Sequence, residues 1–233
     1  MRYDSLQRLN AARRKRLAAV LLSNLRGEER VVLEGDPVEP PFAALVEDAF
    51  RSGRSMTFAR AGASGFLNVY LPAPRMVVIG AVHISQYLMP MARLAGFDVR
   101  IIDPRTGFST RDRFPDVRVS TDWPIDAFVA DPLDRYTALV ALTHDPKIDD
   151  FALAEALRTG CFYIGALGSR KTHAARIGRL AAGGFGVDAL SIIHAPIGLD
   201  IGASTPAEIS VAILGEVIKA LRTSQRTMPG DSP

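Results

Sequence analysis

The first 74 residues combine helix-type and strand-type patterns of apolar positions. The spacing predicts helices over 4–14 and about 41–52, a hairpin of 17–22 and 31–33 around the turn 24–30, and a strand over 66–71. These elements predict a small α+β N-terminal domain over residues 1–74. The segment Leu71-Pro72-Ala73-Pro74 predicts a linker, because proline fits neither a strand ladder nor a helix interior.

Beyond residue 74, short apolar runs alternate with helix patterns. The runs predict strands at 76–79, 99–102, 117–119, 138–142, 162–164 and 191–193, and the periodic segments predict helices at 84–95, 149–158 and 170–182. Strands that are apolar throughout are typical of a parallel sheet covered on both faces. The sequence therefore predicts an α/β fold, with a Rossmann-like doubly wound parallel sheet over residues 75–223.

The last predicted helix has the clearest beginning. Thr205 and Glu208 are spaced as a capping box, and Pro206 lies at the first helical position. The polar residues 224–233 that follow predict a disordered tail.

Charge is distributed unevenly along the chain. Its 233 residues contain 28 Lys and Arg against 25 Asp and Glu, a net charge of +3. Residues 1–30 hold eight basic and three acidic side chains, so this segment carries +5 and the remainder −2. A near-neutral body argues against a nucleic-acid-binding protein with a basic stripe across its main fold. The basic segment is a candidate for contacts with a partner protein or with a second subunit, and an ordinary solvated helix face is the alternative.

Cysteine content and hydropathy restrict the class of protein further. The single cysteine, Cys161, excludes a disulfide framework and a cysteine-based zinc site, and it suits a reducing cytoplasm. Its position at the start of an apolar strand predicts a buried, inert thiol. No apolar run is long enough to cross a bilayer, so we expect no membrane association.

The candidate chemistry follows the predicted strands. Ligands of open parallel sheets bind beyond the carboxyl ends of the strands. The first strand ends in Gly80-Ala81-Val82-His83, and Asp103 lies about 20 residues later, where dinucleotide-binding folds place an acid for the ribose. Val82 departs from that fingerprint, because a glycine there normally lets the backbone approach a pyrophosphate. A Rossmann-type packing turn without a nucleotide is the competing interpretation.

A second glycine-rich turn follows the 162–164 strand. It reads Gly165-Ala166-Leu167-Gly168-Ser169-Arg170-Lys171, and two residues between the glycines are too few for a Walker A loop. Glycines, a serine and two cations at a helix N-terminus nevertheless form a plausible phosphate site. A tight turn with ordinary surface charges is the alternative.

Two further patterns allow more than one interpretation. Three histidines follow strands (His83, His144 and His194), and His173 lies near the same edge, so a metal site with Asp145 or Asp200 is an alternative to hydrogen-bonding loop histidines. Asp149 and Asp150 are interpreted as a charge pair that favours the helix N-terminal dipole.

Together these motifs resemble the XdhC/CoxI family of xanthine dehydrogenase accessory proteins. The motifs occur in one order: Ile79-Gly80-Ala81-Val82-His83, Asp103-Pro104-Arg105, Arg113-Phe114-Pro115, Thr143-His144-Asp145-Pro146, the 163–170 turn and Pro196-Ile197-Gly198-Leu199-Asp200-Ile201-Gly202-Ala203. The resemblance covers about residues 75–222. It implies a bacterial chaperone that binds molybdenum cofactor (molybdopterin), supports its sulfuration with a cysteine desulfurase and passes it to an apo molybdenum hydroxylase of the xanthine dehydrogenase type.

The resemblance also implies a homodimer and a cofactor site at the strand ends. We expect eleven residues to line that site: Gly80, Ala81, His83, Asp103, Arg105, His144, Gly165, Gly168, Ser169, Arg170 and Asp200. A chaperone need not catalyse a reaction, so no catalytic residue is assigned. The family usually has glycine where this chain has Val82, and many members carry a Ser-Gly-Gly-Cys motif that residues 1–74 lack. An NAD(P)-dependent oxidoreductase and a nucleotide-binding regulatory module on the same fold are the alternatives.

Overall fold

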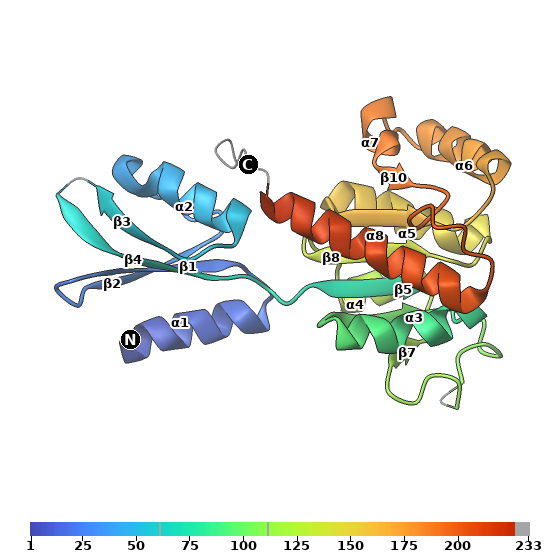
Figure 1. Cartoon of the computed structure of the whole chain (residues 1–233), viewed down its shortest axis with the longest axis horizontal. Helices are drawn as coiled ribbons and strands as arrows, with labels where there is room; N and C mark the ends of the chain where they lie inside the picture. Colours follow the sequence, from blue (N-terminus) through green and yellow to red (C-terminus); the bar gives the residue numbers. More distant parts are fainter. Residues whose placement is uncertain (61, 111, 227–233) are drawn as a thin grey trace. The chain divides into compact units, whose positions relative to one another are not determined.

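The computed structural model describes residues 1–60, 62–110 and 112–226, and it divides the chain into two compact units. Unit 1 comprises Met1–Ala73 with the chain from Arg222 onward, and unit 2 comprises Pro74–Leu221 (Figure 1). No helix among the described residues combines the length and the apolar character needed to cross a bilayer.

Unit 1 is an antiparallel sheet with a helix on each face. Its elements are α1 (Tyr3–Arg14), β1 (Ala19–Asn24), β2 (Glu29–Leu33), α2 (Pro40–Ser52), β3 (Met56–Arg60) and β4 (Ala63–Tyr70), and the strand order is β2-β1-β4-β3. Alternate residues of each strand feed two separate cores. Leu21 and Val31 pack under α1, whereas Val20, Val32 and Leu67 pack under α2.

Unit 2 is a six-stranded parallel sheet in the order β10-β9-β8-β5-β6-β7. Its elements are β5 (Arg75–Ile79), α3 (His83–Leu94), β6 (Asp98–Ile102), β7 (Arg118–Ser120), α4 (Pro124–Ala130), β8 (Thr137–Ala141), α5 (Pro146–Thr159), β9 (Tyr163–Ala166), α6 (Arg170–Ala182), α7 (Val187–Ser191), β10 (Ile193–His194) and α8 (Pro206–Arg226). Strands β5 and β8 are central. The chain adds β6 and β7 on one side of them and then β9 and β10 on the other, as in a Rossmann fold. The predicted doubly wound sheet is confirmed.

Helices cover both faces of this sheet (Figure 1). Helices α4, α5, α6 and α7 contribute to one core, and α3 and α8 to the other. Every residue of β5 and β8 is buried, which explains why their sequences are apolar without alternation. The capping box of α8 forms as predicted, since the Thr205 hydroxyl accepts from the Glu208 amide at 3.2 Å and Glu208 accepts from the Thr205 amide at 3.0 Å.

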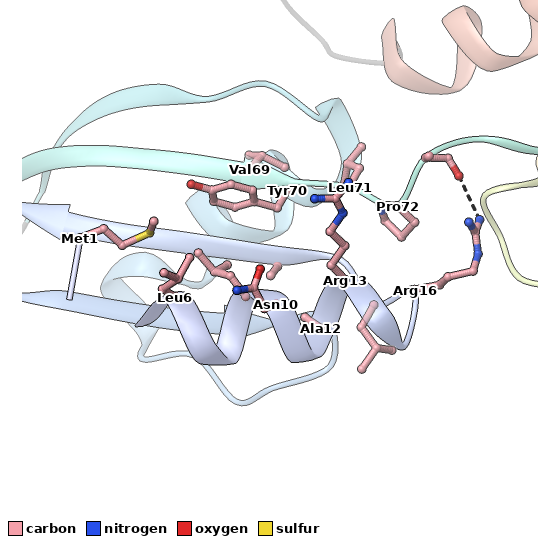
Figure 2. A pocket seen from close by; sticks show the side chains of 14 residues that line it. Met1, Leu6, Asn10, Ala12, Arg13, Arg16, Val69, Tyr70, Leu71 and Pro72 are labelled. Atoms are coloured by element: carbon pink, nitrogen blue, oxygen red, sulfur yellow. Dashed lines mark hydrogen bonds between the residues drawn. The ribbon is translucent and has the colours of Figure 1, made fainter. Parts of the chain in front are cut away.

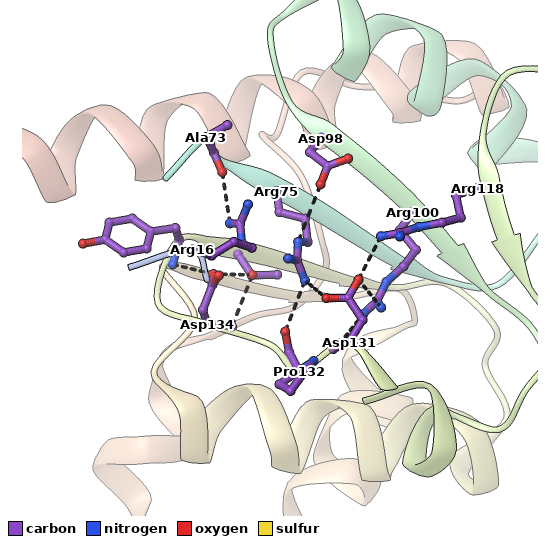
Figure 3. Close-up of polar contacts among 11 residues, drawn as sticks. Arg16, Ala73, Arg75, Asp98, Arg100, Arg118, Asp131, Pro132 and Asp134 are labelled. Carbon is purple, nitrogen blue, oxygen red and sulfur yellow. Dashed lines mark hydrogen bonds and ion pairs between the residues drawn. The ribbon is translucent and has the colours of Figure 1, made fainter. Parts of the chain in front are cut away.

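The amino ends of β5, β6 and β7 are joined by a cluster of charges around Asp131 (Figure 3). Its carboxylate lies 3.0 Å from Arg75, 2.9 Å from Arg100 and 2.8 Å from Arg118. Arg75 and Arg100 are almost fully buried, and burial lowers the pKa of Arg100 to about 10. Asp131 therefore supplies the counter-charge that lets Arg75, the first residue of β5, and Arg100, the middle residue of β6, be buried in the sheet.

Several predicted elements are wrong or incomplete. The sequence patterns do not predict β3, α4 or α7, and residues 187–191 form α7, so the strand predicted at 191–193 is only Ile193–His194. Helix α5 begins at Pro146, three residues early, because the Asp145 side chain caps it by accepting from the Lys147 amide. Residues 224–226 continue α8 and are not a tail, while 227–233 lie outside the described residues.

Candidate functional site

The predicted site residues follow parallel strands, so the fold brings their loops to one edge of the sheet of unit 2. The order in which strands are added to the sheet reverses between β5 and β8, and ligands of such sheets bind at this switch point. Gly80 ends β5 with a φ of 117°, and a Cβ there would come within 2.9 Å of the Thr143 methyl group. Glycine is therefore required by both the backbone and the neighbouring loop.

The Asp103 carboxylate is hydrogen-bonded within the protein through both of its oxygens. It is fully buried, and one carboxylate oxygen accepts from the Ala81 amide at 2.8 Å. Arg105 donates to both oxygens through its amide and guanidinium, at 2.8–3.0 Å. Burial acts to raise the pKa of Asp103, but the hydrogen bonds from Arg105 and Ala81 outweigh it and the pKa is lowered. Asp103 therefore braces the turn after β5 and is not free to hold a ribose.

Arg113, in the loop after β6, is hydrogen-bonded to the turn after β5. The Arg113 guanidinium donates to the Ala81 carbonyl at 2.9 Å and to the Phe108 carbonyl at 2.7 Å. The guanidinium of Arg105 lies 4.7 Å from the Phe108 ring. The hydrogen bond to Asp103 is the main cause of a raised Arg105 pKa, and the charge of Asp145 adds to it. The loop after β6 is thus held against the turn after β5, within electrostatic range of Asp145.

The turn after β8 holds an unusual backbone. His144 is exposed and its backbone has a φ of 61°. This is the left-handed region that residues other than glycine and asparagine rarely adopt. Thr143 holds the turn in place, since its hydroxyl donates to Asp149 at 2.6 Å and accepts from the Asp145 amide at 3.1 Å. His144 is consequently presented to solvent at the carboxyl edge.

A buried charge pair lies beneath this turn and the next. Asp149 is 1% exposed and Arg176 is 2% exposed, and their nearest oxygen and nitrogen are 4.0 Å apart. Burial raises the pKa of Asp149 to about 6, because the Thr143 hydrogen bond and the Arg176 charge offset only part of the desolvation. Arg176 donates to the Leu167 carbonyl at 3.0 Å. The pair therefore joins the loops after β8 and β9.

This finding refines the interpretation of two neighbouring aspartates. Asp149 lies in the first turn of α5, as interpreted, but its side chain is buried and faces Arg176. Asp150 lies at the surface and pairs with Arg179 through both guanidinium nitrogens. A sequence signal for the buried pair existed: Arg176 lies one turn before the core residue Leu180, on the apolar face of α6.

The glycines after β9 serve two different purposes. Gly165 lies inside β9, where a Cβ would come within 2.6 Å of the Ile197 side chain and the Tyr163 hydroxyl, so its role is packing. Gly168 has a φ of 143° and leads into α6. Ser169 caps that helix by accepting from the Thr172 amide at 3.2 Å. The glycine-rich turn thus leads into a helix N-terminus, as predicted, and the structure adds that Ser169 is its cap.

Two cations at this turn are uncommitted. Arg170 and Lys171 are exposed in the first turn of α6, and neither forms a hydrogen bond or ion pair with a residue that the structure describes. Ser169 accepts from the Thr172 amide. The backbone amides of Arg170 and Lys171 come before it and, as in the first turn of any helix, have no partner within the helix. This turn can hold an anion without breaking an existing contact.

The side chains of the other predicted residues form no hydrogen bond, ion pair or ring contact with these groups within the described part of the chain. His83 is exposed at the start of α3 with its ring 5.4 Å from that of Tyr87. Asp200 is exposed in the loop after β10 and has no hydrogen-bond partner within the described ranges. His194 is bound to Glu216 at 2.9 Å. Over the described part of the chain, no three His, Cys, Asp or Glu side chains gather as metal ligands would.

Comparison with known proteins identifies the family. The model of the XdhC Rossmann domain matches residues 76–217, which is most of unit 2 and more than half of the chain. The chain belongs to the XdhC family. The resemblance inferred from the motifs is therefore confirmed.

Three curated relatives of this XdhC chain come from bacteria. It is 28% identical over 156 residues to the uncharacterized protein YqeB of Escherichia coli K12, covering 67% of this chain and 29% of that protein. It is 31% identical to a protein of Bacillus subtilis 168 described as a probable subunit of xanthine dehydrogenase, over 66% of this chain and 45% of that protein. It is 26% identical to the molybdenum cofactor insertion chaperone PaoD of E. coli K12, over 84% of this chain and 53% of that protein. The chain thus spans about half or less of each relative.

A solved structure shares the fold of the whole chain. A xanthine dehydrogenase from Bacillus halodurans superimposes with a TM-score of 0.67 at 23% identity, over 99% of this chain and 71% of that one. At this identity the likeness supports the arrangement of helices and strands and nothing further.

Proposed function

We propose that this XdhC chain binds the molybdenum cofactor at the carboxyl edge of the unit 2 sheet and assists its insertion into a xanthine dehydrogenase-type hydroxylase. The match of residues 76–217 to the XdhC Rossmann domain carries the proposal. Two relatives support it, since one is named as part of a xanthine dehydrogenase and the other as a cofactor insertion chaperone.

The uncommitted groups of the site fit a phosphorylated ligand. Molybdopterin is anionic, and Arg170, Lys171 and their free backbone amides supply donors for its phosphate. His144, which the left-handed turn presents to solvent, would donate to a polar edge of the pterin. The cofactor, when bound, supplies the molybdenum centre of the client enzyme. The residues of this chain hold and release it.

Sulfuration would depend on a partner. The only cysteine of the chain, Cys161, is 6% exposed, and burial raises its pKa to about 12. A thiol that stays protonated and covered is a poor sulfur carrier. We therefore assign sulfur delivery to a cysteine desulfurase and cofactor retention to this chain. We also propose that the chain acts as a cytoplasmic homodimer, which sedimentation velocity would test.

Hydride transfer with NAD(P) is the second function that this fold can support. Two features oppose it: Asp103 has both oxygens occupied by Ala81 and Arg105, and Val82 leaves little room for a pyrophosphate. NAD(H) titrated into the purified protein should show no saturable binding. Saturable binding with substrate-dependent turnover would favour the dehydrogenase.

Charge reversal at the phosphate turn tests the cofactor site. In an equilibrium titration with purified molybdopterin, Arg170→Glu should weaken binding at least tenfold, because a carboxylate would face the ligand phosphate. Lys219→Glu is the matched control, since Lys219 is exposed on α8 away from the turn. Equal affinities for parent, control and a folded Arg170→Glu would remove Arg170 from the site.

A further inference from the structure

Among its described residues, unit 1 has no helix over part of one sheet face. Helix α2 packs across β1, β3 and β4 on one face, whereas α1 packs over β1 and β2 on the other. The register places Phe66 and Tyr70 of β4 on the α1 face, opposite Ser23 and Ala19. Phe66 remains 39% exposed and Tyr70 42% exposed. Two aromatic side chains thus lie uncovered beside α1.

A groove runs between α1 and the end of β4 (Figure 2). It encloses about 620 Å³, and its lining includes Leu6, Asn10 and Arg13 from the helix, Tyr70 from the end of β4 and Leu71 directly after it. All of its lining residues belong to unit 1. The groove is therefore a property of this unit alone.

The dimensions of the sheet match one missing helix. Strands lie roughly 4.8 Å apart, so four strands span about 14 Å between the outer two. Packed helices lie about 8–10 Å apart, so a face of this width has room for a second helix beside one that lies over its edge. Since α1 occupies the half over β1 and β2, a second helix over β4 and β3 would complete the layer.

The charge of the groove specifies what kind of helix fits. Arg13 and Arg16 are the charged members of its lining, and no carboxylate lines it. Arg16 donates to the Ala73 carbonyl at 3.0 Å, while the Arg13 guanidinium has no hydrogen bond or ion pair to any described residue. Residues 1–16 hold six basic side chains and one acidic side chain. The end of the groove near Arg13 therefore favours a negative partner.

We propose that this groove binds an acidic amphipathic helix of a partner protein. The apolar stripe of that helix would cover Leu6 and Tyr70, and acidic residues in its first turn would face Arg13 and Arg16. This orientation runs antiparallel to α1 and also places the acidic residues at the favourable end of the helix dipole. A second copy of this chain is a poorer occupant, because its α1 would bring the same excess of positive charge.

A membrane surface is also a poorer occupant than a protein helix. The apolar residues Leu9 and Ala12 of α1 are buried against the sheet, so the helix has no broad apolar face to insert into lipid. The exposed apolar area lies in a concave groove, which suits a helix of matching width.

Binding of a labelled peptide tests the proposal. The probe is a fluorescein-labelled 14-residue helix with leucines at i, i+4, i+7 and i+11 and glutamates in its first turn. Its fluorescence anisotropy should rise saturably with the full-length chain and weaken with added salt. Arg13→Glu and Tyr70→Glu should each weaken binding at least tenfold, while Arg13→Lys retains most of it. Arg26→Glu, in the exposed β1–β2 turn, should leave the affinity unchanged.

Each other outcome overturns the proposal. One such outcome is that the parent chain shows no saturable binding. Another is that Arg13→Glu and Tyr70→Glu bind the peptide as tightly as the parent while their circular dichroism and unfolding midpoint match it. Tighter binding of a peptide with lysines in place of the glutamates would contradict the charge argument. Binding of the parent to phosphatidylserine vesicles that Tyr70→Glu abolishes would assign the groove to lipid. A dimer that Tyr70→Glu dissociates would assign it to a second copy.

Discussion

The stability of unit 2 should depend on pH through Asp149. Its carboxylate is 1% exposed beneath the turn after β8, and burial raises its pKa from 3.8 to about 6. A raised pKa means that the fold favours the neutral acid. The stabilisation is therefore complete below about pH 4 and is lost as the pH rises through 6. A difference of about two units corresponds to roughly 3 kcal/mol at 1.36 kcal/mol per unit.

Asp149→Asn removes this titration and keeps the shape of the side chain. The amide oxygen can still accept from the Thr143 hydroxyl, as the carboxylate does at 2.6 Å. Relative to the variant, the parent should lose about 3 kcal/mol of unfolding free energy between pH 4 and pH 8. Urea unfolding followed by the single tryptophan, Trp123, measures this in unit 2, where Trp123 precedes α4.

Asp150→Asn is the control for loss of one carboxylate from the same helical turn. Asp150 pairs with Arg179 outside the core, so Asp150→Asn keeps the buried titration of Asp149 and its pH profile should parallel that of the parent. Parallel pH profiles for the parent and Asp149→Asn would refute the reasoning. A parent that gains stability relative to Asp149→Asn as the pH rises would also refute it.

Two further substitutions test the packing of unit 2. Asp131→Ala should lower the unfolding free energy by about 3–5 kcal/mol, because Arg75 and Arg100 would stay buried without their main counter-charge. Urea unfolding measures this loss, and a value below about 1 kcal/mol would contradict the prediction. Gly165→Ala should cost about 1–3 kcal/mol, since the new methyl group would lie 2.6 Å from neighbouring side chains, and an unchanged melting temperature would show that Gly165 is not held by packing.

Local patterns predict the fold because the local signals and the tertiary structure agree. The capping box of Thr205 and Glu208 forms as its spacing requires, and the apolar runs of β5 and β8 are buried on both sides. The pattern fails at α7 and β10, because Ser191-Ile192-Ile193 reads as one apolar run. The tertiary fold ends α7 at Ser191 and leaves a two-residue edge strand.

The candidate site is only partly predictable, because its decisive contacts join distant residues. Asp103 has the position of a ribose-binding acid, yet Ala81, 22 residues away, and Arg105 occupy its oxygens. The burial of Asp149 depends on Arg176, 27 residues later. No local spacing encodes such contacts. The turn from Gly168 to Lys171 is predictable because its glycine, cap and charges are contiguous.

The cofactor content of the purified protein tests the central claim most directly. The chain is purified anaerobically from cells replete in molybdenum cofactor and then oxidised, and the fluorescence of the released pterin is measured. We expect pterin fluorescence that co-elutes with the parent chain and falls at least tenfold with Arg170→Glu. Parent protein without pterin fluorescence would contradict the proposal that this chain carries the cofactor.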